Sequence, residues 1–95
     1  MKKVAIIGVT GSVGQEFVQS LNDHPWFEVT QIAASERSAG KNYLDAIRNE
    51  GGIIMWDVGG EIPEYIKSMT VKKVDELDTS QLDLVFSAVE SKAAI

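Results

Sequence analysis

The chain has 95 residues, of which 44% are hydrophobic and 24% charged, and these values describe one small globular domain. Its net charge of −5 argues against nonspecific binding to nucleic acid, and no apolar run reaches the roughly 20 residues needed to span a bilayer. The sequence has no cysteine and one histidine, so we expect no thiol nucleophile and no metal site. Because the N-terminus passes directly into an apolar strand without a signal-peptide cleavage site, we expect a cytoplasmic enzyme fragment.

The first predicted element is a strand over residues 4–7, a continuously apolar run of the kind found in strands covered on both faces. A helix follows after a short loop. Its apolar side consists of residues at helical spacing, Val13, Phe17, Val18 and Leu21. Its polar side consists of Gln15, Glu16, Gln19 and Ser20. Pro25 ends the helix, and a second strand is predicted over residues 27–34.

The rest of the chain continues the alternation of strands and helices. In chain order we predict a polar loop over 35–40, a short helix within 41–50, a helix over 63–69, a strand over 70–74, a helical or looped connection over 75–81 and a buried strand over 82–89. The apolar stretch 53–58 lies between two glycine pairs and is not assigned to an element. This order predicts an α/β domain with a Rossmann-like, doubly wound, mostly parallel sheet. The sheet is incomplete, with about four strands, the first of them central and the last beside it.

A glycine loop, GVTGSVG, connects the first strand to the first helix and contains Gly8, Gly11 and Gly14. A dinucleotide pyrophosphate binds where it can reach the free amides of a helix N-terminus, and a side chain at the tight turn or at the closest approach would block it. The hydroxyls of Thr10 and Ser12 can donate to phosphate, and either residue can cap the helix. The preceding strand and the following helix favour a dinucleotide-binding loop over a turn whose glycines serve packing alone.

The loop after the second strand begins about 20 residues beyond the glycine loop, where dinucleotide-binding folds recognise the adenosine ribose. An acidic residue alone at this place would select NAD. Here Arg37, flanked by Ser35 and Ser38, offers donors that match a 2′-phosphate, which favours NADP. Glu36 opposes this assignment unless it points away, and the alternative is a solvated loop of mixed charge.

The last strand ends in Ser87 and Ala88, two small residues at the sheet edge where ligands of open α/β sheets bind. They leave room for the dinucleotide to pass. The alternative is a strand end that has no role in binding. We predict that His24 is a turn residue and that Trp26 and Trp56 serve packing.

These motifs resemble aspartate-semialdehyde dehydrogenases of the archaeal-type branch. The resemblance lies in GVTGSVGQ at 8–15, His24 with Pro25, AASERSAGK at 33–41 and VFSA at 85–88, with Val9 where the family commonly has alanine. It implies that Thr10, Gly11, Ser12 and Val13 bind the pyrophosphate. It also implies that the 2′-phosphate is bound by Ser35, Arg37 and Ser38, and a later part of the cofactor by Ser87 and Ala88.

The implied activity is the NADPH-dependent reduction of L-aspartyl 4-phosphate to the semialdehyde, in the synthesis of lysine, threonine and methionine. The cysteine and histidine that catalyse it in the family lie beyond residue 95, so we expect the chain to be inactive alone and to form the N-terminal part of the NADP-binding domain. Its expected partners are NADP(H) and either the missing catalytic domain or another copy of the chain. An unpaired sheet edge predicts self-association, disorder near Ile95 or marginal stability. The alternatives are a related reductase, such as malonyl-CoA or N-acetylglutamyl-phosphate reductase, and a non-catalytic nucleotide-binding module.

Overall fold

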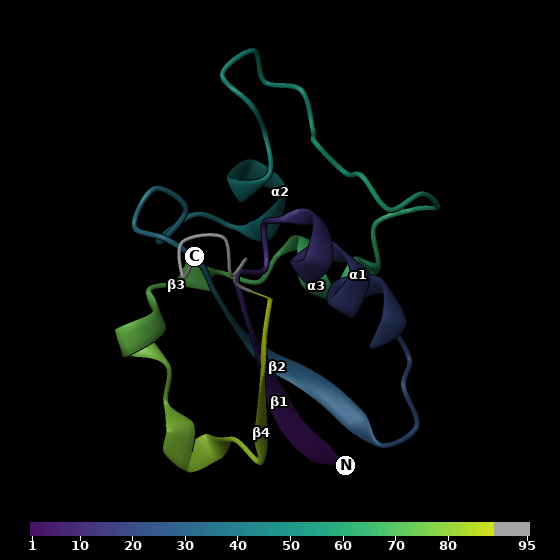
Figure 1. The fold of residues 1–95 in the computed structure, drawn as a ribbon, viewed down its shortest axis with the longest axis vertical. Helices are drawn as coiled ribbons and strands as arrows, with labels where there is room; N and C mark the ends of the chain where they lie inside the picture. The colour runs from purple at the N-terminus through teal and green to yellow at the C-terminus, as the bar shows by residue number, and fades with distance from the viewer. Residues whose placement is uncertain (89–95) are drawn as a thin grey trace, which may run out of the picture.

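The computed structural model describes residues 1–88. Four parallel strands form one sheet in the order β3-β2-β1-β4 (Figure 1). Their bounds are Lys2–Ile7 for β1, Phe27–Ala33 for β2, Val71–Lys72 for β3 and Leu84–Ser87 for β4. The predicted Rossmann-like sheet, with the first strand in the interior and the last beside it, is confirmed.

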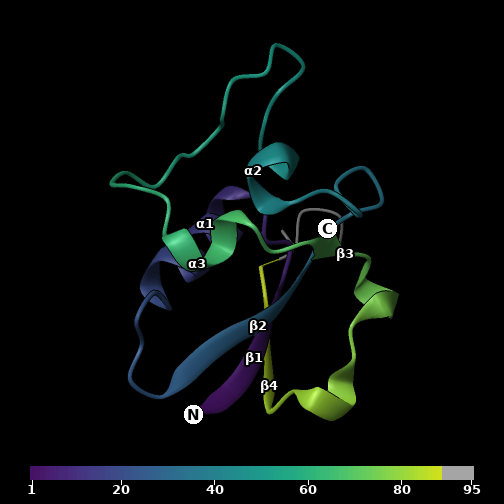
Figure 2. The same cartoon turned by 180° about the vertical axis from the view of Figure 1, so that it is seen from behind.

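The helices are short and lie between the strands in sequence. They are α1 (Ser12–Ser20), α2 (Tyr43–Ala46), α3 (Glu64–Lys67) and the 3-10 turns η1 (Val74–Glu76) and η2 (Thr79–Gln81). Helices α1 and α3 lie on one side of the sheet and the connection with η1 and η2 on the other (Figures 1 and 2). This follows from the strand order, because the first two crossovers step in one direction and the third returns past β2 and β1. None of the helices in residues 1–88 is long and apolar enough to cross a membrane.

The core lies between the sheet and the pair α1 and α3. It contains the buried side chains of Val4, Ile6, Val18, Val29, Ile32 and Ile66. The hydroxyl of Tyr65 in α3 donates to the carbonyl of Val18 in α1 at 2.7 Å, and this bond ties the two helices together. On β4, Phe86 stacks on Phe17 with ring centroids 5.3 Å apart.

Several predicted elements exist but differ in extent. The helices predicted within 41–50 and over 63–69 are single turns, and the connection over 75–81 contains η1 and η2. Strand β3 is shorter than the predicted 70–74, because the chain turns into η1 at Lys73, whose amide donates to the Glu76 carboxylate at 2.8 Å. Of the predicted strand over 82–89, Val89 lies outside the described residues.

The predicted burial of the last strand is wrong. Leu84 and Val85 are 43% and 42% exposed, because β4 forms an edge of the sheet built by residues 1–88 and pairs only with β1 in that part of the chain. Within residues 1–88 the predicted unpaired edge is therefore present, and it carries the apolar side chains of Leu84 and Val85.

One buried glutamine on β2 fixes the long connection from β3 to β4. The side chain of Gln31 donates to the Asp78 carbonyl at 3.1 Å and accepts from the Asp78 amide at 2.9 Å. The ammonium group of Lys72 donates to the same side-chain oxygen at 3.2 Å. These bonds satisfy a polar side chain that is only 8% exposed and hold the connection against the sheet.

Candidate functional site

The three sequence motifs meet at the carboxyl edge of three neighbouring strands. The amides of Gly8 and Val9 both donate to the Ala33 carbonyl, at 2.9 and 3.2 Å, so the loop after β2 begins next to the glycine loop. On the other side of β1, Ile7 pairs with Ser87 and accepts a hydrogen bond from the Ala88 amide at 2.8 Å. In Figure 1 this edge is the end of the sheet that faces α2, away from the N-terminus.

The three glycines of the loop serve different physical needs. Gly8 has a φ of +76°, a conformation that side chains disfavour. A Cβ on Gly14 would lie 2.2 Å from the Gly8 oxygen and 2.7 Å from the Cα of Val9, so this position must be bare for α1 to pack on the loop. A Cβ on Gly11 would meet only the Gly8 oxygen, at 3.8 Å, which is ordinary contact. Packing among these residues therefore does not explain Gly11, whereas the close approach of a ligand would.

The carbonyl groups of residues 8–11 all accept hydrogen bonds from within the chain. Their donors are the Gly11 amide at 3.3 Å for Gly8, the Tyr43 hydroxyl at 3.0 Å for Val9, the Gln15 side-chain amide at 3.0 Å for Thr10 and the Gln15 backbone amide at 2.9 Å for Gly11. The loop thus has its acceptors occupied before any ligand binds.

The amides of the same segment are in the opposite situation. Those of Thr10, Ser12, Val13 and Gly14 have no acceptor among residues 1–88. Free amides and the positive end of the helix dipole together form an anion-binding site. The expectation that Thr10 or Ser12 caps α1 is wrong: the N-cap is Gly11, without a side-chain cap, and the Ser12 hydroxyl donates to the Asp57 carboxylate at 3.1 Å.

Sequence reasoning missed the contribution of Gln15, which it placed on the polar side of the helix. Gln15 is 1% exposed, because segment 53–60, which includes the unassigned stretch 53–58, lies against α1 at this point. Its side-chain nitrogen donates to the Met55 carbonyl at 2.9 Å, and its side-chain oxygen accepts from the Asp57 amide at 2.7 Å. The only signal for this role was the place of Gln15 at the end of the GVTGSVGQ motif.

The loop after β2 presents its charged residues to solvent. It turns where the amides of Ser38 and Ala39 both donate to the Ser35 carbonyl, at 3.0 and 3.1 Å. Ser35, Glu36 and Arg37 are exposed, and Arg37 forms no ion pair within residues 1–88. The guanidinium is therefore available to a phosphate, whereas Ser38, at 9% exposure, is less accessible.

The structure confirms the predicted roles of His24 and Trp56 but not that of Trp26. His24 is a turn residue, as predicted, because its Nδ1 accepts from the Trp26 amide at 3.1 Å. Trp56 packs against the core, also as predicted. The packing role predicted for Trp26 is wrong, since this side chain is 70% exposed in the turn before β2, where its ring and the His24 ring form an edge-to-face pair.

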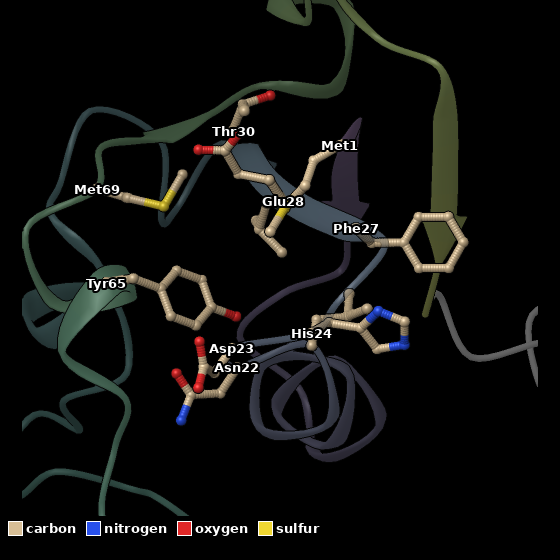
Figure 3. A pocket seen from close by; sticks show the side chains of 11 residues that line it. Met1, Asn22, Asp23, His24, Phe27, Glu28, Thr30, Tyr65 and Met69 are labelled. Carbon is tan, nitrogen blue, oxygen red and sulfur yellow. The ribbon is translucent and has the colours of Figure 1, made fainter.

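A groove of about 1020 Å³ lies elsewhere, between the end of α1, the start of β2 and α3 (Figure 3). Its lining includes Asp23, Phe27, Glu28, Tyr65 and Met69. None of the predicted cofactor residues lines it, so it is separate from the site at the carboxyl edge of the sheet.

The parallel sheet, with a glycine loop at a helix N-terminus whose amides lack acceptors within residues 1–88, defines the class of Rossmann-like nucleotide-binding α/β domains. Residues 3–95 match the family described as "Semialdehyde dehydrogenase, NAD binding domain". The chain belongs to this family.

Relatives and solved structures agree with this assignment. The aspartate-semialdehyde dehydrogenases of Methanothermobacter thermautotrophicus and Schizosaccharomyces pombe are each 40% identical to the chain over 94 residues, which make up 99% of this chain but 25% and 24% of those proteins. The crystal structure of aspartate semialdehyde dehydrogenase with NADP from Candida albicans has a TM-score of 0.81 at 37% identity, covering 99% of this chain and 25% of that one. The chain therefore spans about a quarter of the length of these proteins.

Proposed function

We propose that residues 1–95 form the N-terminal part of the NADP-binding domain of an aspartate-semialdehyde dehydrogenase. The observation that carries the proposal is the hydrogen bonding of the glycine loop. The carbonyls of residues 8–11 accept bonds from within the chain, whereas the amides of Thr10, Ser12, Val13 and Gly14 have no acceptor in residues 1–88. In this proposal the pyrophosphate binds at Thr10, Gly11, Ser12 and Val13, below the N-terminus of α1.

The choice of NADP over NAD rests on Arg37. Its exposed guanidinium has the planar geometry and charge that match a 2′-phosphate, with Ser35 exposed in the same turn. The Candida albicans relative was crystallised with NADP, which supports the same choice. Ser38 lies at the turn and contributes less because it is largely buried. Ser87 and Ala88, at the end of β4, complete the proposed cofactor contacts.

The activity belongs to the whole protein. NADPH, when bound, supplies the hydride, and the residues of this chain bind and orient it. The chain contains no cysteine and so cannot form an acyl-enzyme thioester by itself. The names of the relatives favour aspartyl phosphate reduction over the related malonyl-CoA and N-acetylglutamyl-phosphate reductions. A cytoplasmic location and a catalytic domain as partner are parts of the same proposal.

Titration of the purified chain with NADP⁺ and NAD⁺ tests the proposal. We expect NADP⁺ to bind more tightly than NAD⁺, by about tenfold or more, because a charge-assisted phosphate contact is worth roughly 1.5–3 kcal/mol. Absence of binding would leave only a folding module. Equal affinities would support dinucleotide binding and refute the role of Arg37.

A further inference from the structure

The conformation of the glycine loop depends on two side chains that do not belong to the loop. We propose that Tyr43 and Gln15 are positioning residues that hold the loop in the form that binds the dinucleotide phosphates. This inference rests on the proposed function, since it concerns the same site. Tyr43 sets the direction of the Thr10 amide, and Gln15 holds the following peptide of the loop in place against a distant segment of the chain.

Tyr43 acts from α2, on the other side of β2 in the sequence. Its side chain is fully buried, and its hydroxyl donates to the Val9 carbonyl at 3.0 Å. In a planar trans peptide the carbonyl oxygen and the following amide hydrogen point in opposite directions. Fixing the Val9 carbonyl toward Tyr43 therefore turns the Thr10 amide, which has no acceptor in residues 1–88, away from the core.

The position of Tyr43 is itself fixed. The Tyr43 amide donates to the Met69 carbonyl at 3.0 Å, and the Asn42 side chain caps α2 by accepting from the Asp45 amide at 2.9 Å. Burial raises the pKa of the Tyr43 hydroxyl above its ordinary value, and Tyr65 adds to the effect. The hydroxyl thus remains a protonated donor throughout the neutral pH range.

Gln15 fixes the next peptide plane of the loop. Its side-chain nitrogen donates to both the Thr10 carbonyl and the Met55 carbonyl, and its oxygen accepts from the Asp57 amide. All polar atoms of this buried side chain are used, so it has one orientation that satisfies them. The loop is consequently locked to segment 53–60, and neither side chain needs to contact the nucleotide.

The chain offers matched controls for both residues. Tyr65 also donates its hydroxyl to a backbone carbonyl, that of Val18, and burial raises its pKa as well. Gln31 also bonds one backbone carbonyl and one backbone amide, those of Asp78. Removing either control loses the same kind of bond at a place remote from the glycine loop.

The experiment measures the dissociation constant of NADP⁺ and the thermal midpoint for five proteins: the unaltered chain, Tyr43→Phe, Tyr65→Phe, Gln15→Met and Gln31→Met. Titrations are made at a temperature where each protein is folded. We expect all four substitutions to lower the midpoint. We expect Tyr43→Phe and Gln15→Met to weaken NADP⁺ by about tenfold, since a lost hydrogen bond also frees the loop. Tyr65→Phe and Gln31→Met should stay within about twofold of the unaltered chain.

The outcomes separate this inference from the proposed function. Loss of affinity in the two test variants but not in the controls supports the positioning role. If the unaltered chain binds NADP⁺ and the test variants bind as well as their controls do, the positioning role is refuted while the proposed function stands. If none of the five proteins binds NADP⁺, the proposed function fails and the inference fails with it. Should Tyr43→Phe not fold, the glutamine pair decides by the same criteria.

Discussion

Replacing Gly14 with alanine should destabilise the fold more than an ordinary glycine substitution in a helix. The new Cβ would lie 2.2 Å from the Gly8 oxygen and within 2.8 Å of two Val9 backbone atoms. Backbone atoms cannot rotate away, so α1 must shift from the loop. Overpacking of this kind costs about 1–3 kcal/mol or more, whereas the helix preference of alanine over glycine returns about 1 kcal/mol. Because the clash involves three backbone atoms within 2.8 Å, we take the upper end of that cost, so the net loss is about 2 kcal/mol, which lowers the thermal midpoint of a domain this size by roughly 8–16 °C.

Gly11→Ala is the matched control, because its Cβ would meet only an oxygen at 3.8 Å and its backbone already has a φ of −78°. We expect its thermal midpoint to fall by less than that of Gly14→Ala, since replacing a glycine N-cap with alanine costs only a few tenths to about 1 kcal/mol. Its NADP⁺ affinity should fall markedly, because the methyl group would occupy the path of the pyrophosphate. Circular dichroism melts and NADP⁺ titration measure the two quantities. A Gly14→Ala protein as stable as the unaltered chain would refute the packing argument, and a Gly11→Ala protein with full affinity would refute the ligand argument.

Three further predictions concern charge and the sheet edge. Arg37→Ala should weaken NADP⁺ by about tenfold or more and leave NAD⁺ nearly unchanged, as seen by calorimetry, and equal losses would contradict the role of Arg37. Asp57→Asn should strengthen NADP⁺ binding by roughly twofold to fivefold, because the Asp57 carboxylate lies beside Ser12 and repels a phosphate bound there. Glu61→Gln is the control for a charge that does not contact Ser12, and it should change the affinity less. Val85→Lys should reduce concentration-dependent self-association in sedimentation experiments, because a charge disfavours pairing at an apolar strand edge, and an unchanged sedimentation profile would exclude this edge as the contact.

The parts of the fold that the sequence predicted are those that local patterns control. Local patterns alone identify the βαβ unit. They are the continuous apolar run of β1, the glycines that follow it and the helical spacing of Val18 and Leu21. The strand order followed from the arrangement common to doubly wound sheets, together with the right-handedness of their crossovers. The proposed site inherits this success, because the carboxyl ends of neighbouring parallel strands must meet at one edge.

The errors have a common cause, which is dependence on residues distant in the sequence. Gln15 is polar and sits where a helix could face solvent, and only segment 53–60 buries it. Val85 is apolar and lies in a strand, yet it is exposed, because β4 is at an edge of the sheet formed by residues 1–88. Trp26 is large and aromatic, but its turn holds it outside the core. In each case the exposure of the side chain depends on neighbours that the local sequence does not reveal.

The same distinction applies to the phosphate site itself. The glycine spacing supplies a loop whose backbone can adopt more than one conformation, and these conformations differ in the orientation of the Val9–Thr10 peptide. The hydroxyl of Tyr43, 34 residues away, fixes that orientation, and Gln15 bonds the neighbouring peptide to a segment 40 residues away. Because Tyr43 and the partners of Gln15, Met55 and Asp57, lie far along the chain, a glycine loop of the same sequence without them would be held less firmly. The capacity to bind an anion therefore belongs to the folded domain rather than to the motif.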